Sequence, residues 1–160
     1  MLSAKTIVVW GRRGILLCGI GLLFFGMAYE ASPKSACEFN APDGWSRKAT
    51  QWDGNCVAGR AEGLGVLKEY SEKKVKRFFF GRLKSGDMKF GVIDQDEGFM
   101  AGSFAKGDLI PSDDRQTFID AFAEAEKAAS QAASRFSKTG NKASAGFYER
   151  KAKELREQMD

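Results

Sequence analysis

The spacing of glycines in residues 52–65, WDGNCVAGRAEGLG, restricts the folds available to this chain. Trp52, Gly54 and Cys56 alternate, so in an extended strand they share one face of a sheet. Gly59 follows where a tight turn needs a positive φ, and apolar alternation resumes after it. The segment therefore predicts a β-hairpin whose glycines leave room for side chains to pack against the backbone.

The pattern of this first unit returns twice. In each unit a glycine is followed two residues later by an apolar residue and five residues later by another glycine. The motif residues are Trp52, Gly54, Gly59, Gly63 and Gly65, then Phe79, Gly81 and Gly86, then Gly102, Phe104 and Gly107. A lone hairpin cannot bury its apolar face, so repeated hairpins must stack beside one another. We predict a repeat region over residues 52–110.

These units resemble the MORN repeat, whose pattern runs roughly Y-x-G-x-W-x-x-G-x-x-x-G-x-G. The first unit matches at each glycine, whereas the second has Phe90 and Val92 where the late glycines would fall. The resemblance, to short exported bacterial proteins with such repeats, implies stacked β-hairpins in a single-layer antiparallel sheet. It also implies a scaffold or adaptor function in protein–protein interaction. Cys56 stands at the second aromatic position of the family.

The N-terminus has the three parts of a secretory signal peptide. Lys5, Arg12 and Arg13 precede an apolar stretch at 15–28, which ends in small residues suited to cleavage and is short for a membrane span. We predict residues 1–28 as a signal peptide and expect a periplasmic or secreted protein. The alternative is an uncleaved inner-membrane anchor that leaves the protein facing the periplasm.

Export leaves Cys37 and Cys56 in the mature chain, and an even number of cysteines in an oxidising compartment predicts a disulfide. Two free thiols are the alternative for a protein that stays in a reducing compartment. Given the aromatic position that Cys56 occupies in the resemblance, the bond would tie part of the N-terminal cap segment, residues 29–51, over the open end of the sheet.

After Pro111 the apolar period changes from that of a strand to that of a helix. The first helical stripe consists of Phe118, Phe122, Ala125, Ala129, Ala132 and Phe136. Gly140 then breaks the pattern before a second stripe begins. We predict an α-helical hairpin over 111–160, hence an α+β fold. Because repeat regions draw most of their stability from neighbouring repeats, we also expect the repeats to fold without the helices.

Charge and residue types restrict the function. The chain has no histidine, which removes the usual general base and every Ser-His or Cys-His mechanism. Its 25 basic residues include three that precede the apolar stretch, which leaves 22 against 21 acidic residues and no footprint for nucleic acid. The best acidic cluster, Asp94, Asp96 and Glu97, fits a turn better than a metal or catalytic site. We predict no enzymatic activity, metal or cofactor.

A basic cluster precedes three phenylalanines: Lys73, Lys74, Lys76 and Arg77. It is a candidate contact for an anionic membrane surface, although a solvated turn is the simpler interpretation. We therefore expect a non-catalytic envelope protein that serves as a scaffold or adaptor for an envelope or secretion-associated partner. The alternatives are a membrane-surface or polyanion-binding module acting through 73–77 and, in third place, a histidine-free enzyme based on carboxylates.

Overall fold

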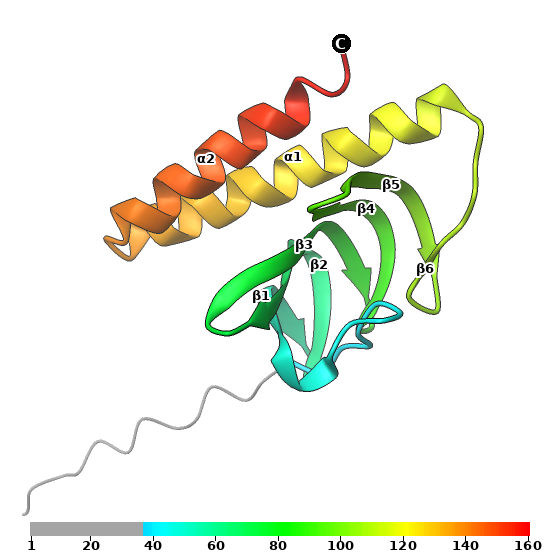
Figure 1. Cartoon of the computed structure of the whole chain (residues 1–160). Helices are drawn as coiled ribbons and strands as arrows, with labels where there is room; N and C mark the ends of the chain where they lie inside the picture. Colours follow the sequence, from blue (N-terminus) through cyan, green and yellow to red (C-terminus); the bar gives the residue numbers. More distant parts are fainter. Residues whose placement is uncertain (1–36) are drawn as a thin grey trace, which may run out of the picture. The chain divides into compact units, whose positions relative to one another are not determined.

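The computed structural model describes residues 37–160, so the predicted signal segment and the first part of the cap segment lie outside the described residues. The elements follow one another along the chain as hairpins and then helices (Figure 1). They are η1 (Arg47–Ala49), β1 (Thr50–Val57), β2 (Arg60–Ser71), β3 (Lys74–Lys84), β4 (Asp87–Gln95), β5 (Gly98–Ala105), β6 (Asp108–Leu109), α1 (Arg115–Lys138) and α2 (Lys142–Arg156).

The six strands form one open antiparallel sheet in the order β1-β2-β3-β4-β5-β6. Each strand pairs with the next along the chain, and two helices follow, which confirms the predicted α+β fold of consecutive hairpins. The three predicted units correspond to the hairpins β1–β2, β3–β4 and β5–β6. Their turns contain Gly59, Gly86 and Gly107 at φ of 78°, 86° and 94°, a region that costs glycine little.

A row of glycines crosses the sheet from β1 to β5, each paired with the next. It consists of Gly54, Gly65, Gly81, Gly91 and Gly102. The Trp52 ring lies over Gly54 and Gly65, where an added Cβ would overlap it, and the Phe79 ring lies over the next two glycines. The row therefore makes room for aromatic side chains, as the sequence indicated. Each ring comes from within its own hairpin.

Gly91 belongs to this row, although the sequence pattern placed Phe90 and Val92 at the late glycine positions. The difference arises from β-bulges. In the first hairpin the register shifts after Gly54, so that Asn55 pairs with Glu62 and two residues of β2 bulge out. In the second hairpin the shift bulges out only one residue of β4. Gly63 lies in the first bulge at φ 78° with open space around it, so its role is conformational.

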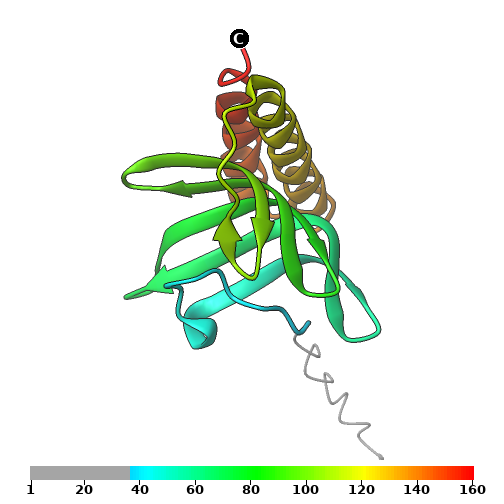
Figure 2. The same cartoon turned by 90° about the vertical axis from the view of Figure 1, so that its right-hand side faces the viewer.

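The single-layer sheet is covered on both faces, because alternate side chains point to opposite sides. On one face, Val66, Phe80 and Val92 are fully buried against the helices. On the other face a second cluster forms with the cap segment, and in it Phe79 and Phe104 meet edge to face with ring centroids 5.5 Å apart. Figures 1 and 2 show the helices and the cap segment on opposite sides of the sheet. Both faces are therefore parts of a hydrophobic core.

The cap segment joins the three hairpin turns through its backbone. The amide of Glu38 donates to the carbonyl oxygen of Gly59 at 2.8 Å, and that of Asn40 donates to Gly86 at 2.9 Å. The amide of Asp43 lies 3.4 Å from the carbonyl oxygen of Gly107 in the third turn. One short segment thus fixes the hairpins relative to one another, which extends the predicted cap from one end of the sheet to all three units.

Helix α1 contacts β2, β3, β4 and β5, and α2 packs on α1. Small side chains along α1 allow this close approach, since Ala125, Ala128 and Ala132 are fully buried. Asp114 caps α1 by accepting from two backbone amides, and Asn141 caps α2. The helices cover the buried apolar residues of β2, β3 and β4 on one face, so the packing does not support the expectation that the repeats fold alone. Pro111 marks a change of secondary structure within one core.

Candidate functional site

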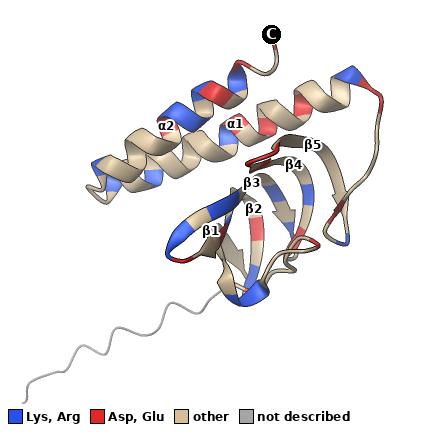
Figure 3. Ribbon diagram, viewed as in Figure 1, with Lys and Arg blue, Asp and Glu red and all other residues tan. Residues whose placement is uncertain are grey.

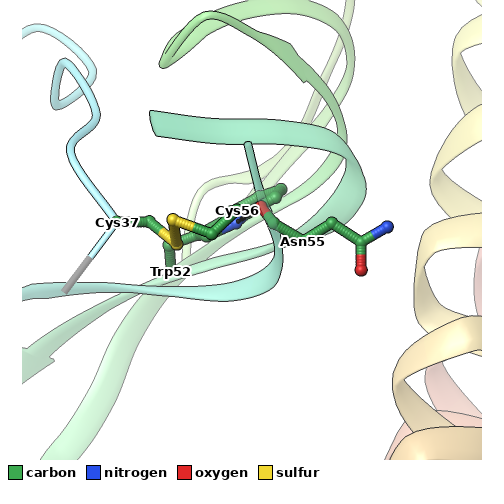
Figure 4. The surroundings of a disulfide bond; sticks show 4 residues. All are labelled: Cys37, Trp52, Asn55 and Cys56. Atoms are coloured by element: carbon green, nitrogen blue, oxygen red, sulfur yellow. Dashed lines mark hydrogen bonds between the residues drawn. A yellow bond between two sulfur atoms is a disulfide. The ribbon is translucent and has the colours of Figure 1, made fainter. Parts of the chain in front are cut away.

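The predicted disulfide joins Cys37 to Cys56, with Cα atoms 5.7 Å apart, inside the usual range. Figure 4 shows the bond linking the cap segment to the end of β1, beside Trp52. Cys56 is exposed, whereas Leu83 and Phe104 at the same position of the later units are buried. The bond therefore braces the cap segment and does not fill an aromatic site. Close by, the Trp52 ring nitrogen donates to the Asn55 carbonyl at 2.9 Å.

The predicted basic cluster divides between two environments. Lys73, Lys74 and Lys76 are exposed at the β2–β3 turn, which projects from the sheet (Figure 3). Arg77 instead points to the cap side, where its Nε donates to Glu69 at 2.6 Å and its Nη2 to a cap carbonyl at 2.8 Å. Arg77 is thus occupied in holding the cap segment, and three lysines remain for an anion.

Glu69 is a buried carboxylate, 5% exposed, at the centre of that contact. It also accepts the backbone amide of Ser46 at 2.7 Å. Burial alone would raise its pKa, but the hydrogen bonds from Arg77 and Ser46 lower the pKa below the ordinary value of 4.5. Glu69 therefore stays ionised and ties the cap segment to β2 and β3, which is a structural role.

The acidic cluster is also divided. Asp94 forms an ion pair with Lys151 of α2 at 2.7 Å, while Asp96 and Glu97 are exposed in the β4–β5 turn. Burial alone would lower the pKa of Lys151, yet its bonds to Asp94 and Glu154 raise it overall. Asp94 thus connects the sheet to the helices. Within residues 37–160, no group of three or more acidic or cysteine side chains could hold a metal ion.

A cleft that the sequence did not indicate opens between the β2–β3 hairpin and the turn that joins the helices. Its volume is about 590 Å³. It is lined by five aromatic residues, two lysines and three other side chains: Tyr70, Phe78, Phe136, Phe147 and Tyr148, Lys68 and Lys74, and Val75, Ala143 and Ser144. Lys74 is the residue of the predicted basic cluster that reaches this cleft.

The aromatic side chains of the cleft brace one another. The Phe136 and Tyr148 rings stack with centroids 5.4 Å apart and planes inclined by 4°. Phe78 and Phe147 approach from opposite walls, with centroids 5.6 Å apart. Tyr148 also meets Phe80 edge to face, which connects the cleft to the core beneath it. Burial, and next the charge of a nearby aspartate, raise the pKa of Tyr148, so its hydroxyl stays neutral.

The two lysines of the cleft differ in availability. Lys68 lies 3.3 Å from a carboxylate oxygen of Asp53 and 5.8 Å from the centroid of the Phe136 ring. Asp53 also pairs with Arg135 of α1 at 3.0 Å, so Lys68 and Arg135 share this one carboxylate. Lys74 is exposed and makes no ion pair with any described residue. It is therefore the free cation of the cleft.

The sequence could not reveal this cleft because its walls come from two distant segments. Phe78 belongs to a run of three phenylalanines, of which Phe79 faces the cap and Phe80 the helices. Phe136 and Phe147 belong to helical stripes that resemble ordinary core. One feature of the sequence could have indicated the cleft. Phe136 and Phe147 place aromatic side chains on both sides of the turn between the helices, where two helices alone bury little surface.

Comparison with known proteins gives no match: no family model, no curated protein and no solved structure is significantly similar to this chain. In the described part of the chain, no helix combines the length and the apolar character needed to cross a bilayer.

Proposed function

We propose that this protein is an exported, non-catalytic envelope protein, a MORN-like scaffold or adaptor that binds a partner protein at the aromatic cleft. The observation that carries the proposal is the cleft itself, where partly exposed aromatic side chains of the sheet and of the helices face a common space. Concave, aromatic sites with a few polar groups are typical binding sites. Aromatic residues also dominate the energetics of protein interfaces.

The bracing around the cleft supports a scaffold. Ion pairs join the sheet to the helices at three places, namely Asp53–Arg135, Asp94–Lys151 and Arg82–Glu124. The cap segment and its disulfide hold the hairpins on the other side. Walls that are fixed before binding lose little conformational entropy when a partner docks, so a modest contact area suffices.

The disulfide supports export, because such bonds persist in oxidising compartments and are rare in the cytosol. We therefore place the protein in the periplasm or outside the cell after removal of residues 1–28, with an N-terminal anchor as the alternative. The partner is then an envelope or secretion-associated protein.

A second candidate is contact with an anionic membrane surface. The observation in its favour is the exposure of Lys73, Lys74 and Lys76 on one projecting turn. Against it, Arg77 is engaged by Glu69, and Glu72 lies in the same turn. Three lysines offset by one glutamate are fewer cations than the clusters of about four to eight that hold a segment on an anionic bilayer.

Site-directed photo-crosslinking in intact cells tests the proposal. A photoreactive residue replaces Ala143, an exposed position in the cleft, or Ala105, an exposed alanine on β5 that serves as the matched control. We expect one discrete protein adduct from position 143, weakened by Phe147→Glu in the same chain, and none from position 105. Equal adducts from both positions, or none from position 143, would contradict a partner in the cleft.

A further inference from the structure

We propose that the segment of the partner that enters the cleft is acidic and carries an aromatic side chain. The aromatic side chain packs among Phe78, Phe136 and Phe147, and the carboxylates beside it face Lys74. This inference rests on the proposed function and deepens it by naming the chemistry of the partner. It follows from the shape of the cleft, from its charge, and from the positions of the exposed apolar side chains.

The shape selects a single large side chain. Phe78, Phe136 and Phe147 are each partly buried, and all three line the cleft, so part of their aromatic surface stays available to a docking side chain. A volume of about 590 Å³ is sufficient for one aromatic side chain and a short length of backbone. An inserted ring can meet Phe78 and Phe147 in the tilted or edge-to-face geometries that aromatic pairs prefer.

The charge around the opening selects an acidic segment. Lys74 lines the cleft at the start of β3, Lys73 precedes it in the β2–β3 turn and Lys76 follows it in β3. Lys142 begins α2, whose next two residues line the cleft. Figure 3 shows basic residues at both of these places. Among the acids, Asp53 is already paired with Lys68 and Arg135. Only Glu72 on the β2–β3 turn offsets the lysines, which leaves the rim positive.

The positions of the exposed apolar side chains favour a peptide over a membrane. Among residues 37–160, the large apolar side chains that project into solvent are Val57, Met100, Ile110 and Phe118, and none of them lines the cleft. A bilayer is engaged by projecting apolar side chains, whereas the aromatic surface near the lysines is recessed. An extended peptide can insert one side chain into such a recess, which a flat lipid surface cannot do.

Fluorescence anisotropy with the purified, disulfide-bonded protein tests the inference. The probe is a labelled peptide with one tryptophan flanked by two acidic residues on each side. One control peptide has alanine in place of tryptophan, and another has glutamine in place of the acids. We expect both controls to bind at least about tenfold more weakly than the probe. Equal binding of all three peptides, or no binding of the probe, would overturn the inference.

Two variants locate the binding without disturbing the core. Lys74→Glu reverses the free charge of the cleft, and Ala143→Trp fills the cleft from an exposed helical position. We expect each to weaken binding of the probe by about tenfold or more. Lys127→Glu changes an exposed lysine of α1 outside the cleft and should leave binding unchanged. Equal loss in all three variants would show a non-specific charge effect and would overturn the inference.

A sedimentation experiment with lipid vesicles tests the membrane alternative. Sedimentation with vesicles of phosphatidylglycerol and phosphatidylcholine should show no binding that depends on Lys74. Binding to these vesicles without binding to the peptide would replace the inference by the membrane alternative. If photo-crosslinking gives a cleft-dependent adduct while the acidic peptide does not bind, that result would overturn only the chemistry assigned to the partner. Absence of both would overturn the proposed function as well.

Discussion

The indole ring of Trp52 lies directly over the backbone of Gly65 on the neighbouring strand, where an added Cβ would overlap it. The same relationship recurs in the second hairpin, where the Phe79 ring covers Gly81 and Gly91. The glycine row thus leaves room over the sheet, and the Trp52 and Phe79 rings cover its first four members. This packing explains why the glycine spacing was the strongest signal in the sequence.

Gly81→Ala tests this role of the glycine row. Gly81 does not have a positive φ, but its Cβ would meet the Phe90 carbonyl oxygen, and also the Phe79 ring and the Cα of Gly91 at 2.6 and 2.8 Å. We expect overpacking to lower the free energy of unfolding by about 3 kcal/mol. Urea unfolding followed by tryptophan fluorescence measures the change.

Gly59→Ala is the matched control. Gly59 has a φ of 78° and no atom within 4 Å of an added Cβ, so only backbone strain opposes the substitution. We expect a loss of about 1 kcal/mol. A larger loss in Gly59→Ala than in Gly81→Ala would show that turn conformation, and not ring packing, determines the spacing.

The disulfide is expected to contribute about 3 kcal/mol, because it closes a loop of about 20 residues in the unfolded chain. Cys56→Ser should lose this contribution, as should reduction of the wild-type protein. The resemblance suggests that Cys56→Phe is milder, but Cys56 is exposed and has no aromatic site beside it. We therefore expect Cys56→Phe and Cys56→Ser to be destabilised alike. Thermal unfolding of both, with and without reductant, compares them, and a clearly more stable phenylalanine variant would contradict this.

Removal of residues 111–160 should abolish the folded sheet. The truncation exposes Val66, Phe80 and Val92, which are fully buried under the helices. Loss of such a face removes several kcal/mol from a domain whose total stability is about 5–15 kcal/mol. Circular dichroism of the truncated protein measures the sheet content. Retention of a cooperative unfolding transition would show that the repeat region is independent after all.

A point substitution separates packing from truncation. Phe80→Ala removes a fully buried ring between the sheet and the helices and should lower stability by about 3–5 kcal/mol. Phe118→Ala changes a phenylalanine of α1 that is 44% exposed, so a smaller effect is expected. Equal losses of unfolding free energy in Phe80→Ala and Phe118→Ala, measured by urea unfolding, would contradict the packing of Phe80 between the sheet and the helices.

Glu69 should make stability depend on acid pH. Its pKa is lowered in the folded protein, so its contribution is fully present above the ordinary value of 4.5 and is lost as the pH falls through the lowered pKa. Glu69→Gln should destabilise at neutral pH and flatten the decline of stability in acid. Chemical unfolding between pH 7 and the acid range measures both slopes. The exposed Glu97→Gln is the control, and equal behaviour of the two variants would contradict the role of Glu69.

The sequence predicted the elements well where local chemistry determines them. Glycines at positive φ mark the turns, the change of period at Pro111 marks the helices, and Gly140 ends the first helix at a φ of 77°. The sequence did not predict features that depend on how one strand pairs with the next. The bulge that leaves one residue fewer in the second hairpin moved Gly91 out of the expected pattern. Register depends on the partner strand, which a motif alone does not contain.

The site was the least predictable part. Arg77 and Lys74 belong to one basic cluster in sequence, yet the strand directs one to the cap and the other to the cleft. Asp94 belongs to an acidic cluster in the sequence, but in the structure it forms an ion pair with Lys151 of α2. These outcomes follow from contacts between segments far apart in the chain.

Hydrogen–deuterium exchange on the complex with the captured partner tests the central claim most directly. If the partner binds in the aromatic cleft, amide protection should rise over 68–78 and 136–148, the two segments that line it. The β5–β6 hairpin, 98–109, lies outside the cleft and should exchange as in the free protein. Protection confined to that hairpin or to the cap segment, with unchanged exchange around Phe78 and Phe147, would contradict the claim.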